Sequence, residues 1–174
     1  PVSPTLPAGW DHGDNDLAAP VAAAMAQRGF VAASIEYRGA SEVVLPAAMR
    51  DTKAAIRWLR ANATTYDINP NAIGAMGGSW GALLAVHAGV TNGIAELEGS
   101  GGTADASSQL SAIVGFSTPA RVADFPETME RYAGIEVELV LLAGAPHTFW
   151  YFPDLFDFTM DRTAAFFHRH LDQP

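Results

Sequence analysis

The chain has 174 residues, a length that fits one domain. Its hydrophobic fraction of 49% and charged fraction of 17% are typical of a folded protein with a core, and its lack of cysteine excludes disulfides and thiolate chemistry. Because 10 Lys and Arg face 19 Asp and Glu, for a net charge of -9, nucleic acid and anionic membrane surfaces are not expected as partners.

One helix and one strand are predicted near the N-terminus. Three prolines within residues 1–16 make any strand there short or confined to a sheet edge, because proline cannot donate to a sheet ladder. Asp16 is a favoured cap for a helix over residues 17–28. The mostly apolar run over residues 30–37 is typical of a strand buried in a parallel sheet.

A long amphipathic helix is predicted to begin at Pro46, since proline suits the first turn of a helix. The expected apolar face consists of Ala55, Ile56, Trp58 and Leu59, and the expected solvated face of Arg50, Asp51, Lys53, Arg57 and Arg60. After a turn, residues 72–76 are predicted to form a second short strand.

The remaining chain continues the alternation of helices and strands. The expected elements are a helix over 80–89, a polar loop over 91–109, strands over 112–116 and 136–142, a short helix around 127–132, and a closing helix over 154–170. This order predicts an α/β fold, in which helices cover both faces of a parallel sheet.

The run Gly77-Gly78-Ser79-Trp80-Gly81 carries the strongest chemical signal. It is a G-x-S-x-G motif between a predicted strand and a predicted helix, which is the setting of a nucleophile elbow. The helix start places backbone N–H groups near a developing oxyanion. The motif therefore predicts that Ser79 is a nucleophile, and the alternative is a Gly-rich turn without chemistry.

A second signal is His147, which lies directly after the last predicted strand. Loops at the carboxyl ends of parallel strands are where α/β folds place their sites. Hydrolases with a nucleophile elbow also have the histidine after the serine in chain order. His147 is therefore the predicted general base, and the alternative is a histidine in a surface loop.

On these residues the chain resembles the α/β-hydrolase superfamily, and within it the small bacterial carboxylesterases akin to acetyl-xylan and feruloyl esterases. The resemblance covers residues 28–38, 46–81, 137–149 and 164–171. It implies one α/β-hydrolase-like domain over residues 1–174, shortened in strand number. It further implies Ser79 as nucleophile, His147 as base and then acid, the Trp80 N–H as an oxyanion donor, and no cofactor or metal.

Two parts of the family pattern are altered. The family's His-Gly-Gly-Gly-Trp-like oxyanion loop corresponds to residues 6–10, in which Ala8 and Gly9 retain N–H donors and Pro7 has none. The strand that carries the triad acid is missing before the last predicted strand. Asp124 is the candidate replacement, with a helix cap as its alternative interpretation. In a serine protease, loss of the acid costs on the order of 10⁴ in rate.

Residues near these motifs predict a largely apolar pocket. The candidate substrate-binding residues are Trp10, Gly78, Phe149 and Trp150, and core packing is the alternative for the last two. The acidic stretch around His12 lacks evident ligand spacing, so no metal site is predicted.

Together these features predict a serine carboxylester hydrolase for small acyl or aryl esters. Two alternatives stay open: an amidase-type relative, such as a serine peptidase or an arylformamidase, and a catalytically silent module that binds a ligand. The expected partner is a small-molecule ester, with neither nucleic acid nor membrane, and a homo-oligomer stays open. No targeting segment is visible, so a cytoplasmic and a secreted location are both open.

Overall fold

Helices and strands alternate along the chain, of which the computed structural model describes residues 2–6, 15–38, 46–118 and 138–172. The strands are β1 (Val2–Leu6), β2 (Val31–Ser34), β3 (Gly74–Gly78) and β4 (Ala112–Phe116). The helices are α1 (Asn15–Gln27), α2 (Pro46–Ala61), α3 (Trp80–Val90), α4 (Ala95–Glu98), the 3-10 turn η1 (Phe149–Tyr151) and α6 (Pro153–Leu171). The predicted α/β class is confirmed.

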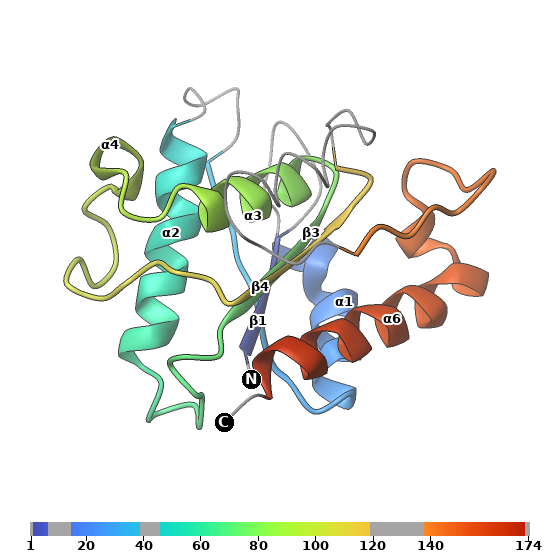
Figure 1. The fold of residues 1–174 in the computed structure, drawn as a ribbon, viewed down its shortest axis with the longest axis horizontal. Coiled ribbons are helices and arrows are strands. Elements are labelled where there is room, and N and C mark those ends of the chain that lie inside the picture. Colours follow the sequence, from blue (N-terminus) through green and yellow to red (C-terminus); the bar gives the residue numbers. More distant parts are fainter. Residues whose placement is uncertain (1, 7–14, 39–45, 119–137, 173–174) are drawn as a thin grey trace.

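The strands form one parallel sheet in the order β2-β1-β3-β4 (Figure 1). Helices α2 and α3 cover one face, and α1 and α6 cover the other. Neighbouring residues of β3 serve the two faces, because Ala75 packs beneath α2 and α3 while Met76 packs beneath α1 and α6. All of β3 is buried, so the turn that follows it is anchored in the centre of the protein.

The predicted helices over 17–28, 80–89 and 154–170 correspond to α1, α3 and α6 within a few residues. β2 is shorter than predicted, because the backbone beyond Ser34 leaves the sheet for α2. There the Arg38 N–H donates to Asp51 Oδ2 at 3.1 Å, and the Arg38 guanidinium binds the same carboxylate. Among the described helices, none is long and apolar enough to cross a membrane.

β1 lies in the middle of the sheet, between β2 and β3. The prolines predicted a strand that is short or at an edge, and β1, with five residues, is short. In the register, Pro4 lies opposite Ala33 of β2. Pairing with β3 involves only Thr5 and Leu6 of β1. The proline therefore precedes the residues that pair with β3, which explains how a central strand tolerates it.

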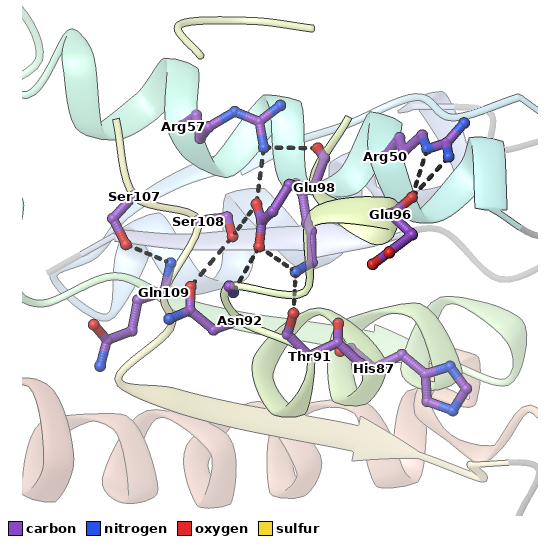
Figure 2. Close-up of polar contacts among 12 residues, drawn as sticks. Arg50, Arg57, His87, Thr91, Asn92, Glu96, Glu98, Ser107, Ser108 and Gln109 are labelled. Atoms are coloured by element: carbon purple, nitrogen blue, oxygen red, sulfur yellow. Dashed lines mark hydrogen bonds and ion pairs between the residues drawn. The ribbon is translucent and has the colours of Figure 1, made fainter. Parts of the chain in front are cut away.

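The predicted solvated face of α2 is wrong at two positions. The side chains of Lys53 and Arg57 are 0% and 2% exposed, whereas the predicted core residue Trp58 is 44% exposed. Lys53 Nζ lies 2.6 Å from Glu98 Oε1. Arg57 Nη1 lies 3.1 Å from Oε2 of the same carboxylate, as Figure 2 shows. The helix thus buries two cations beneath α4, which supplies their counter-charge.

The loop around α4 is also bound through its backbone carbonyls. Arg50 donates to the Glu96 carbonyl at 2.7 and 3.1 Å, and Arg57 donates to the Gly101 carbonyl at 2.6 Å. Ser108 donates to Glu98 Oε2 at 2.8 Å (Figure 2). The predicted polar loop over 91–109 is therefore fixed by the basic residues of one helix face, which lie three or four positions apart.

Residues 138–142 do not form the predicted strand. Leu139, Val140 and Leu141 are exposed, and β4 is the edge strand beside which this segment would have to pair. A strand needs a hydrogen-bonding neighbour, and none is recorded for this segment in the part of the chain that the structure describes. Residues 136–137 and the predicted helix around 127–132 lie outside the described residues.

Candidate active site

The turn between β3 and α3 holds Ser79 in a strained backbone conformation. Its φ is 51° and its ψ is -116°, in a region that side chains other than glycine seldom adopt. The Ser79 N–H donates to the carbonyl of Phe116, at the end of β4, over 2.8 Å. The nucleophile candidate is therefore tied to the neighbouring strand as well as to its own.

The two glycines before Ser79 allow this turn to close. A Cβ atom on Gly77 would lie 2.5 Å from the carbonyl carbon of Gly81, in the first turn of α3. A Cβ atom on Gly78 would lie 2.2 Å from Cζ2 of Trp150. Both approaches are too short for any side chain, so the small residues of the motif are a steric requirement.

The structure brings the two predicted catalytic residues together. His147 Nε2 lies 2.9 Å from Ser79 Oγ, which is hydrogen-bond distance. With Nε2 unprotonated, the serine hydroxyl donates to it, as transfer of the serine proton would require. The histidine is exposed, whereas Ser79 is half-buried at the end of a buried strand.

The histidine loop contacts the sheet at two further points. The Ser117 hydroxyl donates to the carbonyl oxygen of His147 over 2.7 Å. Trp150 is 1% exposed and stacks on Phe116 with ring centroids 5.8 Å apart. The same indole meets the His147 ring edge-on, with centroids 6.1 Å apart.

A small, largely apolar cavity lies beside the elbow. Its lining residues are Ala18, Val21, Met76, Gly77, Gly78, Phe116, Trp150 and Tyr151. Of the predicted substrate-binding residues, Gly78 and Trp150 line this cavity, while Phe149 packs edge-on against Phe116 in the core. Trp150 also packs in that core, so the two interpretations of its sequence position are compatible.

Several predicted site residues lie outside the described residues: Asp124, Ala8, Gly9 and Trp10. Trp80 is the first residue of α3, immediately after the serine. Within the described ranges, no carboxylate lies within hydrogen-bond distance of the His147 ring. Nor do the described residues contain a group of three His, Asp or Glu placed to hold a metal ion.

Tyr37 is a buried phenol, 4% exposed. It belongs to the core beneath α2 and α3. Burial, and to a lesser extent the nearby Tyr151, raise the pKa of Tyr37 well above its ordinary value of 10.0. The phenol therefore stays protonated at neutral pH.

Sequence reasoning missed Ser117 as part of this arrangement. Its one sequence signal is its position, directly after a predicted strand and hence at the same sheet edge as the elbow. The bond to His147 joins residues 30 positions apart, and nothing in the local pattern around Ser117 indicates it.

A serine on a strained strand-to-helix turn, hydrogen-bonded to a histidine in a loop beyond the sheet, defines an α/β hydrolase. The sequence agrees with this fold. The chain belongs to the BD-FAE family of α/β-hydrolase esterases, whose profile matches residues 7–148.

Individual relatives are esterases. The chain is 33% identical to Esterase LipQ of Mycobacterium tuberculosis over 114 residues, which are 64% of this chain and 27% of that protein. A truncated carbohydrate esterase from gut microbiota has a TM-score of 0.63 and 32% identity, over 70% of this chain and 47% of that one. The chain thus spans about a quarter of the former and about half of the latter.

Esterase 2 of Thermogutta terrifontis, phosphonylated by cyclosarin, is similar over more of its length. The TM-score is 0.78 at 23% identity, over 94% of this chain and 79% of that one. At this identity the likeness concerns the fold alone, and it agrees with the α/β-hydrolase fold seen in the described residues.

Proposed function

We propose that the chain is a serine carboxylester hydrolase that works through an acyl-enzyme. The observation that carries the proposal is the 2.9 Å approach of His147 Nε2 to Ser79 Oγ, at a turn whose conformation presents the serine. Membership of the BD-FAE family and the names of the relatives, an esterase and a carbohydrate esterase, support an ester as the substrate.

In this mechanism Ser79 Oγ attacks the ester carbonyl while His147 Nε2 accepts the hydroxyl proton. The tetrahedral oxyanion accepts hydrogen bonds from the N–H groups of Trp80 and of Ala8 or Gly9. His147 then donates the proton to the leaving alkoxide, and the acyl group remains on the serine. Water, deprotonated by His147, attacks the acyl-enzyme; the bond between the acyl carbon and Ser79 Oγ then breaks, the acid is released, and His147 returns the proton to Ser79 Oγ. No step uses a cofactor or metal.

The acyl group is proposed to be small or aromatic. The cavity beside the elbow is lined mostly by apolar groups, including Phe116 and Trp150. None of the described residues in its lining is cationic, so an anionic acyl group would find no counter-charge among them.

The decisive experiment compares the hydrolysis of p-nitrophenyl acetate by the chain and by its Ser79→Ala variant. We expect turnover by the chain and a loss of several orders of magnitude in the variant, because the nucleophile is removed. Turnover that is unchanged in Ser79→Ala would contradict the proposal. Equal turnover of p-nitroacetanilide by the chain would favour an amidase-type relative.

A fluorophosphonate probe distinguishes the silent module. Labelling of Ser79 in the intact chain, detected by mass spectrometry, together with no turnover would indicate an activated serine in an incomplete site. The absence of both labelling and turnover would favour the silent module, the alternative supported by the lack of a carboxylate at the His147 ring among the described residues and by Pro7 in the oxyanion loop.

Asp124 is proposed as the partner of the His147 ring. Removing a triad acid costs about 10⁴ in kcat in the serine protease template, so Asp124→Asn should lower kcat steeply while leaving KM nearly unchanged. Glu127→Gln is the matched control, because it removes the same charge from the same stretch of sequence. Equal kcat values for the two variants would exclude Asp124 as the acid.

A further inference from the structure

The end of β4 contacts both members of the serine–histidine pair. The carbonyl of Phe116 accepts the Ser79 N–H over 2.8 Å. The next residue, Ser117, donates its hydroxyl to the His147 carbonyl over 2.7 Å. Consecutive residues therefore fix one backbone group of the nucleophile and one of the base, although these two residues come from segments far apart in the chain.

Ser117 has an unusual backbone conformation. Its φ is 45°, and the other described residues besides glycine with positive φ are Asp67 and Ser79. The chain also folds back closely here, because a Cβ atom on Gly115 would lie 2.4 Å from Thr118 Oγ1. Such a conformation persists only where the surroundings hold it, and it directs the hydroxyl away from β4 toward the histidine loop.

His147 depends on this contact because its own segment gives it little support. It follows residues 138–142, which form no strand and of which 138–141 are exposed. In the part of the chain that the structure describes, His147 hydrogen-bonds to Ser79 through its ring and to Ser117 through its carbonyl, and to no other residue. The backbone of this loop has local hydrogen bonds, such as that from the Phe149 N–H to the Pro146 carbonyl, but among the described residues the bond from Ser117 is the one that ties the His147 backbone to another segment.

We propose that Ser117 is a positioning residue for the Ser79–His147 pair. Its hydroxyl fixes the backbone of His147, and the ring is thereby kept within reach of the serine. This inference rests on the proposed function, in which His147 moves the serine proton. A displacement of about 1 Å in such a geometry can lower a rate about 100-fold, so the loss of one restraint is sufficient to be measured.

The chain offers a matched control on the same strand. Ser111 lies at the opposite end of β4, and its hydroxyl also donates to a backbone carbonyl, that of Asn71, over 2.8 Å. Ser111→Ala therefore removes the same atom and the same kind of bond, away from the pair. Ser117→Gly serves as a second test variant, because glycine adopts a positive φ without strain, although it removes Cβ as well as the hydroxyl.

With p-nitrophenyl acetate, Ser117→Ala and Ser117→Gly should lower kcat by about 10- to 100-fold and leave KM within about twofold, while Ser111→Ala changes neither. The two Ser117 variants differ in backbone strain, so a loss that they share is due to the hydroxyl. If Ser117→Gly and Ser111→Ala have the same kcat as the unmodified chain, the proposal is overturned.

A second measurement does not depend on turnover. The imidazole signals of His147 in a long-range ¹H–¹⁵N spectrum, assigned by their loss in His147→Gln, should shift when Ser79 is changed to Ala. We expect this shift to be lost in the Ser117→Gly background and kept in the Ser111→Ala background. A shift kept in both backgrounds would overturn the positioning role. If the chain has no Ser79-dependent turnover but the imidazole shift is lost in Ser117→Gly and kept in Ser111→Ala, the proposed function is contradicted and the positioning role of Ser117 is not.

Discussion

The two members of the serine–histidine pair are held in different ways. The serine follows a fully buried strand, and both glycines before it are enclosed by atoms that leave no room for a side chain. The histidine lies on an exposed segment that is held by a hydroxyl from β4 and by the packing of Trp150. The position of the nucleophile is thus part of the folded core, whereas the position of the base depends on a few contacts between distant segments.

Because of this difference, we expect substitutions near the serine and substitutions near the histidine to affect stability and activity to different extents. A change beside the serine disturbs close packing in the centre of the protein, so it should destabilise the fold. A change in the histidine segment alters few buried contacts, so it should affect the reaction more than the free energy of unfolding. The following substitutions test that contrast in order of expected effect.

Gly77→Ala should have the largest effect. Its new methyl group would meet the backbone of Gly81 and Ala82 within 3 Å, and backbone in the first turn of α3 cannot move aside. Overpacking of this kind costs about 3 kcal/mol of unfolding free energy, measured by urea denaturation. Gly89→Ala is the control, because its methyl group would meet side chains and no backbone, chiefly the Cδ1 end of Ile113. Equal losses in the two variants would contradict the contrast between backbone and side-chain neighbours.

Glu98→Gln tests a buried cluster that has no part in the proposed reaction. The substitution leaves the side chains of Lys53 and Arg57 without their carboxylate, and breaking such a pair costs about 3 kcal/mol when fully buried. Glu98 is 23% exposed, so we expect a loss of about 2 kcal/mol with turnover unchanged. Glu96→Gln, which changes an exposed charge on the same helix, should leave the unfolding free energy unchanged.

The same cluster predicts a dependence of stability on pH. Burial raises the pKa of Glu98, but hydrogen bonds from Lys53, Ser108 and Gly93 and the charge of Lys53 outweigh it and hold the pKa below its ordinary value of 4.5. A lowered folded pKa stabilises the protein above the unfolded value and loses this contribution as pH falls through the folded value. The difference in unfolding free energy between the chain and Glu98→Gln should therefore shrink as the pH falls through and below about 4.5. A constant difference over this range would refute the linkage.

Glu138→Gln should have the smallest effect. Glu138 lies in the exposed segment before the histidine and binds Arg162 and Arg169 of α6, each at 2.5 Å. All three side chains are partly exposed, so the loss should stay below about 1 kcal/mol and should decrease at high salt. Thermal unfolding at low and high salt measures it, with Glu36→Gln as an exposed control. A loss as large as that of Gly77→Ala would show that this segment belongs to the core.

Local patterns predicted the parts of the fold that depend on local sequence. The strand over 112–116, the helix after Ser79 and the closing helix follow from apolar runs, glycine turns and terminal residues, and the structure contains all three. The proximity of Ser79 and His147 was also predictable, because Ser79 follows a strand and His147 follows a segment that the sequence predicts to be a further strand of the same parallel sheet.

Features that depend on distant segments were not predictable in this way. The local pattern predicts that Lys53 is solvated. In the structure it is buried against Glu98, which lies 45 residues later in the chain. Residues 138–142 have a strand-like sequence, but a strand also requires a neighbour, which local sequence does not reveal. Ser117 likewise gains its contact from a residue 30 positions away.

The contact between Gly78 and Trp150 also restricts how this chain can vary. The indole occupies the volume that a side chain at position 78 would need, so the two positions share one space. A larger residue at position 78 becomes acceptable only together with a smaller one at position 150, and each change alone should be unfavourable. Because Trp150 follows the base by three residues and Gly78 precedes the nucleophile by one, the two catalytic segments are expected to change together in sequence.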